Sequence, residues 1–408
     1  MKKPELLAPA GNLTKLITAV QYGADAVYIG GEEFSLRAAA DNFSKDDLRR
    51  GIDYAKNHGK KVYVAANVIM RNGDIDRLYD FVRDIDDAGA DSVILADLGA
   101  FEVVKDTAPR LDIHISTQAN TTNYVSANAW YKMGAKRVVI SREMSEADVR
   151  LLREKTDPGL ELEAFVHGAM CISFSGRCLF SNYMTGRDAN HGECAHPCRW
   201  KYYLVEEQRP GEYIPVFEND SGSFFFNSKD LCLIEFISGL VGVGIDSFKV
   251  EGRVKSEYYV ATVVKAYREE IDRYFENPNA YVLDKRNLEE LCKVSHREYS
   301  RGFWNGMPHS EGQIYDKSSY IRDYDVSGIV EECDENGNAW VCQRNKFSVG
   351  DELEILRPKG DFLRMTVEEM YNEKGERIES APHATMKVRM RLPQYTAPNS
   401  MLRHRRKS

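Results

Sequence analysis

The chain has 408 residues, of which 43% are hydrophobic, and a formal net charge of −8. This length suits a large barrel domain with a small appended module, and the apolar content excludes a disordered chain. The acidic balance argues against a general affinity for polyanions, and the longest apolar runs have the length of strands rather than of membrane spans. The N-terminus lacks an apolar signal core, so we expect a cytoplasmic protein that is not a membrane protein.

A short phrase recurs in which a glycine is followed two residues later by an apolar run. It occurs at Gly23–Ile29, Gly89–Leu95, Gly134–Ile140 and Gly244–Val250, and a variant occurs at Gly59–Val64. Glycine adopts the left-handed conformation that ends many helices. The β-branched run after it is typical of a parallel strand that is buried on both faces. The phrase therefore predicts repeated helix–strand units.

Amphipathic helices are predicted before these glycines, with Ser44 and Ser145 as candidate N-caps. The apolar positions at helical spacing are Leu13, Leu16, Ile17 and Val20; Leu48, Ile52 and Ala55; Ile75, Leu78, Val82 and Ile85; and Val149 and Leu152. A longer helix is predicted from about Ser256 to Phe275, after the last apolar run.

Eight strands are predicted in all, and eight parallel strands separated by helices indicate a closed (β/α)8 barrel of the TIM type. The strands are Glu5–Ala8, Ala26–Gly30, Lys61–Ala66, Ser92–Ala96, Ile113–Thr117, Arg137–Ile140, Leu162–Val166 and Ser247–Val250. A doubly wound open sheet is the alternative, and it often carries a glycine-rich phosphate loop after the first strand. The segment Leu7–Asn12 is not such a loop, which favours the barrel.

The predicted domains follow from these strands. Residues 1–310 form the barrel, and a cysteine-rich insertion at about 168–246 follows the seventh strand, at the end that carries the active site in this fold. Short strands broken by turns predict a small antiparallel β-barrel at 318–393. Residues 394–408 are predicted to form a basic tail, which either docks RNA or is simply solvated.

Four of the eight cysteines lie within 28 residues, in the pattern Cys171-x6-Cys178-x15-Cys194-x3-Cys198. Four thiolates can close either a tetrahedral zinc site or an iron–sulfur cubane. Zinc modules mostly use Cys-x2-Cys knuckles, so the wider spacing favours a [4Fe-4S] cluster, with zinc and unligated thiols as alternatives. Cys232 is a reserve ligand, although it lies where a helix is predicted to begin and core burial is the plainer interpretation.

The segment Glu163–Ser181 (EAFVHGAMCISFSGRCLFS) resembles the signature of the collagenase-like peptidase family (class U, family 32). Supporting matches occur at Leu7–Asn12, Ser116–Asn120, Ser141–Glu143, Asn227–Asp230, Lys249–Arg253 and Asn345–Asp351. Within the family, Cys194–Trp200 and Glu206–Tyr213 look closest to the branch that hydroxylates tRNA uridine. In a quinone-hydroxylating branch the fourth cysteine lies in a segment that this chain lacks, and the closer resemblance to the tRNA branch implies that Cys198 takes that role here.

That resemblance implies a bacterial tRNA-modifying enzyme that converts the wobble uridine to 5-hydroxyuridine without molecular oxygen. It also implies prephenate as the hydroxyl donor and an iron–sulfur cluster as the cofactor. A homologous partner protein or a homo-oligomer is a further expectation. The older family label makes a peptidase the first alternative, although the chain has neither a Gly-x-Ser-x-Gly nor a His-Glu-x-x-His motif. A non-catalytic RNA-binding protein with structural zinc is the second.

Prephenate is a dianion, so its site needs cations, and the fork of arginine matches a carboxylate. We therefore expect substrate-binding residues at the C-terminal ends of the strands, where amides could also bind a uracil ring. The candidates are Arg37, Gln118, Asn120, Arg142, Lys249 and Arg253. The catalytic candidates are His167 and Glu251, because histidine and carboxylate groups act as acids and bases near neutral pH.

Each of these candidates has a plainer structural interpretation. Glu251 could simply pair with Arg253, and Arg142 could pair with Glu143 on the surface. Lys249 could point outward toward a helix, and His167 could be a buried structural histidine.

Overall fold

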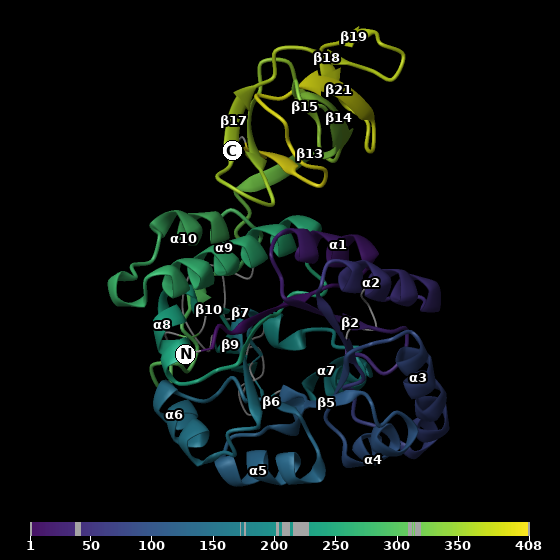
Figure 1. The fold of residues 1–408 in the computed structure, drawn as a ribbon, viewed down its shortest axis with the longest axis vertical. Coiled ribbons are helices and arrows are strands. Elements are labelled where there is room, and N and C mark those ends of the chain that lie inside the picture. The colour runs from purple at the N-terminus through teal and green to yellow at the C-terminus, as the bar shows by residue number, and fades with distance from the viewer. Residues whose placement is uncertain are drawn as a thin grey trace.

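The protein consists of a barrel of strands and helices with a smaller β-domain beside it (Figure 1). The computed structural model describes residues 2–36, 42–171, 173–174, 177–200, 228–308, 312, 314 and 320–406, and the backbone of 204–205 and 213–214. Across these residues, no helix combines the length and the apolar character needed to cross a bilayer.

The barrel is closed and parallel. Its strands are β1 (Glu5–Pro9), β2 (Ala26–Gly30), β3 (Lys61–Ala65), β4 (Ser92–Leu95), β5 (Asp112–Ile115), β6 (Arg137–Val139), β7 (Glu161–Ala169) and β11 (Ser247–Val250). Each strand pairs with the next in this order, β11 pairs with β1, and β7 pairs with β11, which closes the ring. The predicted TIM-type fold is therefore confirmed.

Helices cover the outside of this ring, as the amphipathic patterns predict (Figure 1). They are α1 (Leu13–Gln21), α2 (Lys45–Asn57), α3 (Ile75–Asp87), α4 (Leu98–Thr107), α5 (Tyr124–Met133), α6 (Glu146–Lys155), α8 (Ile237–Gly242), α9 (Glu257–Glu276) and α10 (Lys285–Leu291). The hydroxyls of Ser44 and Ser145 accept hydrogen bonds from backbone amides and cap α2 and α6 as predicted. The five repeated glycines have φ between +67° and +118°, so they do occupy the left-handed region.

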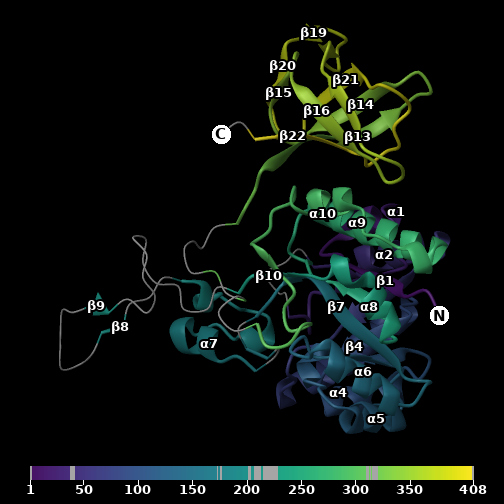
Figure 2. The same ribbon diagram turned by 90° about the vertical axis from the view of Figure 1, so that its left-hand side faces the viewer.

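Helix α7 (Phe180–Thr185) of the cysteine insertion lies on the side of the barrel opposite the N-terminus (Figure 2). The insertion also contains the 3-10 turn Pro197–Arg199, β8 (Leu204–Val205), β9 (Tyr213–Ile214) and β10 (Asp230–Cys232). Strand β10 pairs antiparallel with the end of β7 and parallel with β12 (Tyr299–Ser300). The helix predicted to begin around Cys232 is therefore wrong at that point, because this segment is drawn into the sheet and α8 begins only at Ile237.

The C-terminal domain is an antiparallel, curled sheet with its own apolar core, which includes Val330, Phe347 and Val388. Its strands are β13 (Tyr324–Cys333), β14 (Asn338–Gln343), β15 (Phe347–Ser348), β16 (Glu352–Leu356), β17 (Leu363–Thr366), β18 (Met370–Tyr371), β19 (Arg377–Ile378), β20 (Ser380–Ala381), β21 (Lys387–Arg391) and β22 (Met401–Arg405). The predicted antiparallel module is confirmed.

The predicted basic tail at 394–408 is corrected by the structure. Strand β22 lies inside the sheet between β13 and β16, and the side chain of Arg403 is completely buried. Its guanidinium lies 2.7 Å from Glu290 of α10 and 2.9 Å from Glu354 of β16. Arg403 therefore joins the C-terminal domain to the barrel helices, whereas Arg405 and Arg406 at the end of the described chain are exposed.

Candidate active site

A cavity of about 180 Å³ lies at the carboxyl ends of the barrel strands, beneath the cysteine insertion. This end carries the active site in (β/α)8 barrels, because the loops there are free to vary. Its lining includes Tyr28, Asn67, Ser116, Gln118, Arg142, Phe165, Lys249, Glu251 and Arg253 from the barrel, and Cys171, Phe174, Cys178, Cys194, His196, Cys198 and Arg199 from the insertion.

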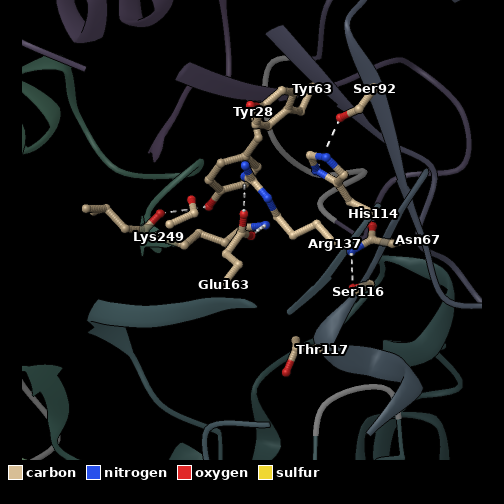
Figure 3. Close-up of polar contacts among 12 residues, drawn as sticks. Tyr28, Tyr63, Asn67, Ser92, His114, Ser116, Thr117, Arg137, Glu163 and Lys249 are labelled. Atoms are coloured by element: carbon tan, nitrogen blue, oxygen red, sulfur yellow. Dashed lines mark hydrogen bonds and ion pairs between the residues drawn. The ribbon is translucent and has the colours of Figure 1, made fainter. Parts of the chain in front are cut away.

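Below the cavity, the barrel interior holds a network of buried charges whose side chains point toward one another (Figure 3). The ammonium of Lys249 lies 2.8 Å from one carboxylate oxygen of Glu163, and the guanidinium of Arg137 lies 2.9 Å from the other. Arg137 also lies 2.7 Å from both Glu5 and Glu161. Each buried charge thus has an opposite charge beside it, which offsets the cost of removing it from water.

The network also influences the protonation of Lys249, the member of the network that faces the cavity. Burial raises the pKa of Glu163, but Lys249 and Arg137 together outweigh this effect and leave that pKa below its usual value. Burial lowers the pKa of Lys249 below its ordinary range, and the carboxylate of Glu163 opposes that shift. Glu163 is therefore ionised at neutral pH and stabilises the ammonium form of Lys249.

Lys249 points into the barrel, so the interpretation in which it points outward is wrong. Its ammonium lies 4.6 Å from the ring centre of Tyr28 and 5.4 Å from that of Phe165. Aromatic faces attract a cation at such distances. The two rings and Glu163 together hold the ammonium group at the floor of the cavity.

Two arginines add to this positive charge. Arg142 donates from Nη1 to the carbonyl oxygen of Ala169 at 2.9 Å, and its guanidinium lies 5.2 Å from the ring centre of Phe165. Arg253 lines the cavity although its side chain is buried, and its Nη1 occupies the space that a β-carbon at Gly30 would need. Glycine at position 30 is therefore what allows Arg253 to reach the cavity.

Glu251 is the predicted catalytic residue that the structure brings to the cavity. Its amide donates to the carbonyl oxygen of His167 at 2.8 Å, and its own carbonyl oxygen accepts from the hydroxyl of Tyr259 at 3.0 Å. These bonds fix the backbone on both sides of the residue, which places Glu251 at the wall of the cavity.

All four clustered cysteines line the same cavity. Cys171 is exposed and the other three are half-buried. Burial raises the pKa of the Cys198 thiol to about 11, Arg199 lowers it, and the charges of Cys171, Cys194 and Cys178 raise it. The four thiols are therefore close enough to act on one another electrostatically.

The thiols fit an iron–sulfur cluster by their chemistry and by their common cavity. Among the side chains that the structure describes, no three His, Cys, Asp or Glu residues converge tightly enough to hold a metal ion. Ligation of a cluster therefore stays a prediction. Between the two candidates for the fourth ligand, the placement favours Cys198, because Cys232 is buried in β10 and does not line the cavity.

His167 does not reach the cavity, which corrects its predicted catalytic role. A register shift between β7 and β11 pairs it with Val250 and turns its ring away from the barrel interior. The ring is 1% exposed and packs 5.2–5.9 Å, centre to centre, from Tyr259, Tyr267 and Tyr299. Burial lowers its pKa to about 3, so it is neutral at physiological pH.

The remaining predicted substrate-binding residues divide three ways. Gln118 lines the cavity, where its side-chain oxygen accepts a hydrogen bond from the Ser116 hydroxyl at 2.9 Å. Asn120 lies outside it, in a shallow neighbouring depression, and accepts a hydrogen bond from Arg177. Arg37 lies outside the described residues.

Sequence reasoning missed several cavity residues, among them Asn67 and Ser116, whose side chains lie 3.4 Å apart. One signal could have found Asn67, since it directly follows the third predicted strand. The contributions of His196 and Arg199 could not be anticipated, because the path of the insertion across the barrel is set by tertiary contacts.

A closed parallel barrel with cations at the floor of its cavity and thiols on its outer side defines a (β/α)8-barrel protein with an enzyme-like site. The family model described as peptidase family U32 matches residues 11–314, and the model of its C-terminal domain matches residues 322–403. The chain therefore belongs to peptidase family U32.

Three curated relatives illustrate the range of this family. The chain is 41% identical to tRNA hydroxylation protein P1 of Bacillus subtilis, covering 98% of this chain and 95% of that protein. It is 36% identical to tRNA hydroxylation protein P of Escherichia coli, covering 97% and 95%. It is 29% identical to a collagenase of Porphyromonas gingivalis, covering 95% and 94%.

Proposed function

We propose that this protein hydroxylates the wobble uridine of tRNA to 5-hydroxyuridine without molecular oxygen. In this proposal prephenate donates the hydroxyl group, and a [4Fe-4S] cluster is held by Cys171, Cys178, Cys194 and Cys198. Support comes from relatives named as tRNA hydroxylation proteins, which align over nearly the whole chain. The observation that carries the proposal is that one cavity combines three cationic side chains of the barrel with four thiols of the insertion.

The cations suit a small dianion. Lys249 and Arg253 come from β11 and the segment after it, and Arg142 comes from the segment after β6. All three line a common space, so two carboxylates of one ligand can each meet a positive group. The carboxylate of Glu163, 2.8 Å away, favours the positively charged form of Lys249 for this purpose. The rings of Tyr28 and Phe165 exclude water from the same space, which strengthens each charge–charge contact.

The amide side chains suit the nucleobase. Asn67 follows β3 and Gln118 follows β5, and the hydroxyl of Ser116 joins their side chains. An amide can both donate to and accept from the polar edge of uracil. Glu251 is the carboxylate in the cavity that can take the proton released from the ring carbon.

A cluster held by all four thiols would supply or accept single electrons, and a cluster with one open iron would supply a Lewis acid. Anaerobically purified protein should contain roughly four irons per chain if the cubane is present. The Cys194→Ser variant should lose iron, whereas Cys292→Ser is the matched control, because Cys292 is exposed and lies away from the cavity.

Nucleoside analysis tests the activity itself. Cells that lack the gene should have no 5-hydroxyuridine derivatives at the wobble position, and wild-type cells should lose them when prephenate is withheld. A plasmid that encodes the Arg253→Met variant should not restore the modification. Normal wobble hydroxylation in the deletion strain would contradict the proposal.

A peptidase is the second candidate, because the Cys194 sulfur lies 3.8 Å from Nδ1 of His196 and a thiol–imidazole pair is a common hydrolytic arrangement. If purified protein cleaves casein, if cleavage is lost in both Cys194→Ala and His196→Ala, and if tRNA nucleosides are unchanged, the peptidase replaces the hydroxylase. A colourless protein that contains only zinc and modifies nothing would instead indicate an RNA-binding module.

A further inference from the structure

The rim of the cavity carries exposed aromatic rings and an excess of cationic side chains. We define the rim as the described residues of 171–200 together with Arg71, Lys255 and Tyr320, which contact or flank that segment. A base that enters a cavity must leave the stack of bases in its loop, so the neighbouring nucleotides stay outside at the rim. Proteins bind such unstacked nucleotides with aromatic faces and arginine side chains.

One side of the rim carries a shallow depression lined by Asn120, Thr122, Ser173, Phe174 and Arg177. Phe174 lines both this depression and the main cavity, and it is 46% exposed. A large ring that is open to solvent therefore stands at the boundary between the cavity and the surface.

Arg177 is held in place beside this ring. Its Nε donates to the side-chain oxygen of Asn120 at 2.7 Å. Asn120 is itself fixed, because it adopts the left-handed conformation (φ +52°) and its amide nitrogen donates to the carbonyl oxygen of Thr117 at 3.3 Å. The guanidinium is thus oriented although its side chain is exposed.

The other side of the rim repeats the arrangement. Arg199 lines the cavity and donates from Nη1 to the hydroxyl of Tyr320 at 3.3 Å. The ammonium of Lys255 lies 4.1 Å from the centre of the Tyr320 ring. Trp200, the next residue after Arg199, is 42% exposed. Aromatic and cationic groups thus alternate on both sides of the entrance.

The charge of the rim differs from that of the whole chain. Its cations are Arg71, Arg177, Arg187, Arg199 and Lys255. Its carboxylates are Asp188, which is paired with Arg71, and Glu193. A rim with an excess of cations on a chain of net charge −8 complements a polyanion locally.

We propose that this rim binds the single-stranded nucleotides on both sides of the reacting uridine. The neighbouring bases stack on Phe174 and on Trp200 with Tyr320, and Arg177 and Arg199 contact the phosphates. The inference rests on the proposed function for the identity of the RNA, and it adds the surface that selects a loop over a duplex.

Binding of a fluorescent stem-loop RNA with uridine in its loop tests the proposal, using full-length protein and anisotropy. Phe174→Ala and Trp200→Ala should each weaken loop binding roughly tenfold, because a stacking surface is removed. Trp200→Phe should restore most of the affinity. Tyr395→Ala is the matched control, because Tyr395 is a 52% exposed aromatic residue of the C-terminal domain.

Arg177→Ala should weaken binding and reduce its dependence on salt, since one phosphate contact is lost. A perfect duplex of equal length should bind more weakly than the stem-loop, and the aromatic variants should not alter its binding. Near-wild-type loop binding by the folded aromatic variants would overturn the inference. So would a change of oligomeric state in these variants without a change in RNA affinity, which would make the rim a protein interface.

These outcomes separate the inference from the proposed function. Rim-dependent binding of loops by a protein that hydroxylates nothing would leave the inference standing and remove the function. If the rim variants instead hydroxylate tRNA fully and bind the loop with unchanged affinity, the proposed function stands and the inference about the rim is overturned.

Discussion

Two buried arginines each lie among carboxylates in this protein, one inside the barrel and one between the domains. Arg137 joins three carboxylates of the barrel strands, and Arg403 joins Glu290 of α10 to Glu354 of β16. Both side chains are almost completely removed from solvent. Both guanidinium groups form short ion pairs with carboxylates, but the other charged groups near them differ.

The difference lies in the second cation of each network. Between the domains, Lys293 lies 2.8 Å from the same two carboxylates as Arg403, so the charges neutralise one another. In the barrel, Lys249 shares Glu163 with Arg137 but lines a cavity on its other side. The two networks thus differ in the charge that they present to open space: the barrel network presents the cation Lys249 to the candidate active site, whereas the interdomain network presents the carboxylate Glu290 to a separate pocket.

Breaking the interdomain network should have the largest effect. The Arg403→Met variant leaves Glu290 with Lys293, and leaves Glu354 with Lys293 and the exposed Arg364, so the free energy of unfolding should fall by roughly 3 kcal/mol. Arg405→Met on the same strand is the control, because that side chain is exposed and its loss should change stability by less than about 0.5 kcal/mol. Urea unfolding measures both, and equal effects would show that the network does not join the domains.

Removing the cation that faces the cavity should affect binding more than folding. In Lys249→Met the carboxylate of Glu163 keeps its contact with Arg137, while the cavity loses its central charge. Prephenate affinity, measured by calorimetry, should fall about 100-fold. Unchanged affinity would show that the dianion binds elsewhere.

The carboxylates of the barrel offer a matched pair. Glu163 contacts Lys249 and Arg137, whereas Glu161 contacts Arg137 without contacting Lys249. Since Glu163 opposes the lowering of the Lys249 pKa, Glu163→Gln should lower that pKa further. Prephenate binding should then be roughly tenfold weaker at alkaline pH. As the pH rises, the affinity should begin to fall at a lower pH in this variant than in the wild type, because Lys249 loses its proton earlier. Glu161→Gln should leave this pH profile in place, and identical profiles for the two variants would refute the positioning role of Glu163.

The smallest expected effect is a change in stability at mildly acidic pH that comes from His167. This residue is buried and ionisable, but it belongs to neither of the two networks. Its folded pKa of about 3 lies below the ordinary 6.5, so the unfolded chain takes up a proton at a pH where the folded chain does not. Stability should therefore fall as the pH drops from 6.5 toward 3, by about 1 kcal/mol at pH 5.5. His167→Phe should remove this part of the acid sensitivity in thermal melts. A loss of activity without any change in the acid profile would return His167 to the catalytic candidates.

Much of the barrel could be predicted, because its signals are local. The run Ala26–Gly30 is apolar, β-branched and preceded by a glycine, and the structure places β2 at the same residues. Strand β7 is longer than predicted, since it continues beyond the ring to pair with β10. That pairing joins residues more than sixty positions apart and leaves no periodic trace in either segment.

The candidate site was predictable to the extent that strand ends meet at one face. Topology alone brings Arg142, Lys249 and Arg253 together with the clustered cysteines, and all of them line the cavity. His167 and Asn120 were placed wrongly by the same rule. A register shift turns His167 outward, and Asn120, which has a left-handed backbone conformation, lines the neighbouring depression at the rim instead of the cavity itself.

The sequence by itself determined the barrel, the antiparallel module and the grouping of cysteines above the strand ends, because periodicity, glycine punctuation and spacing are local properties. Only the tertiary structure decided that the last strand is central and not a tail, that Lys249 faces inward beside Glu163, and that His167 is excluded from the cavity. Those outcomes depend on which distant segments pair and in what register, and a shift of one residue reverses the direction of a side chain.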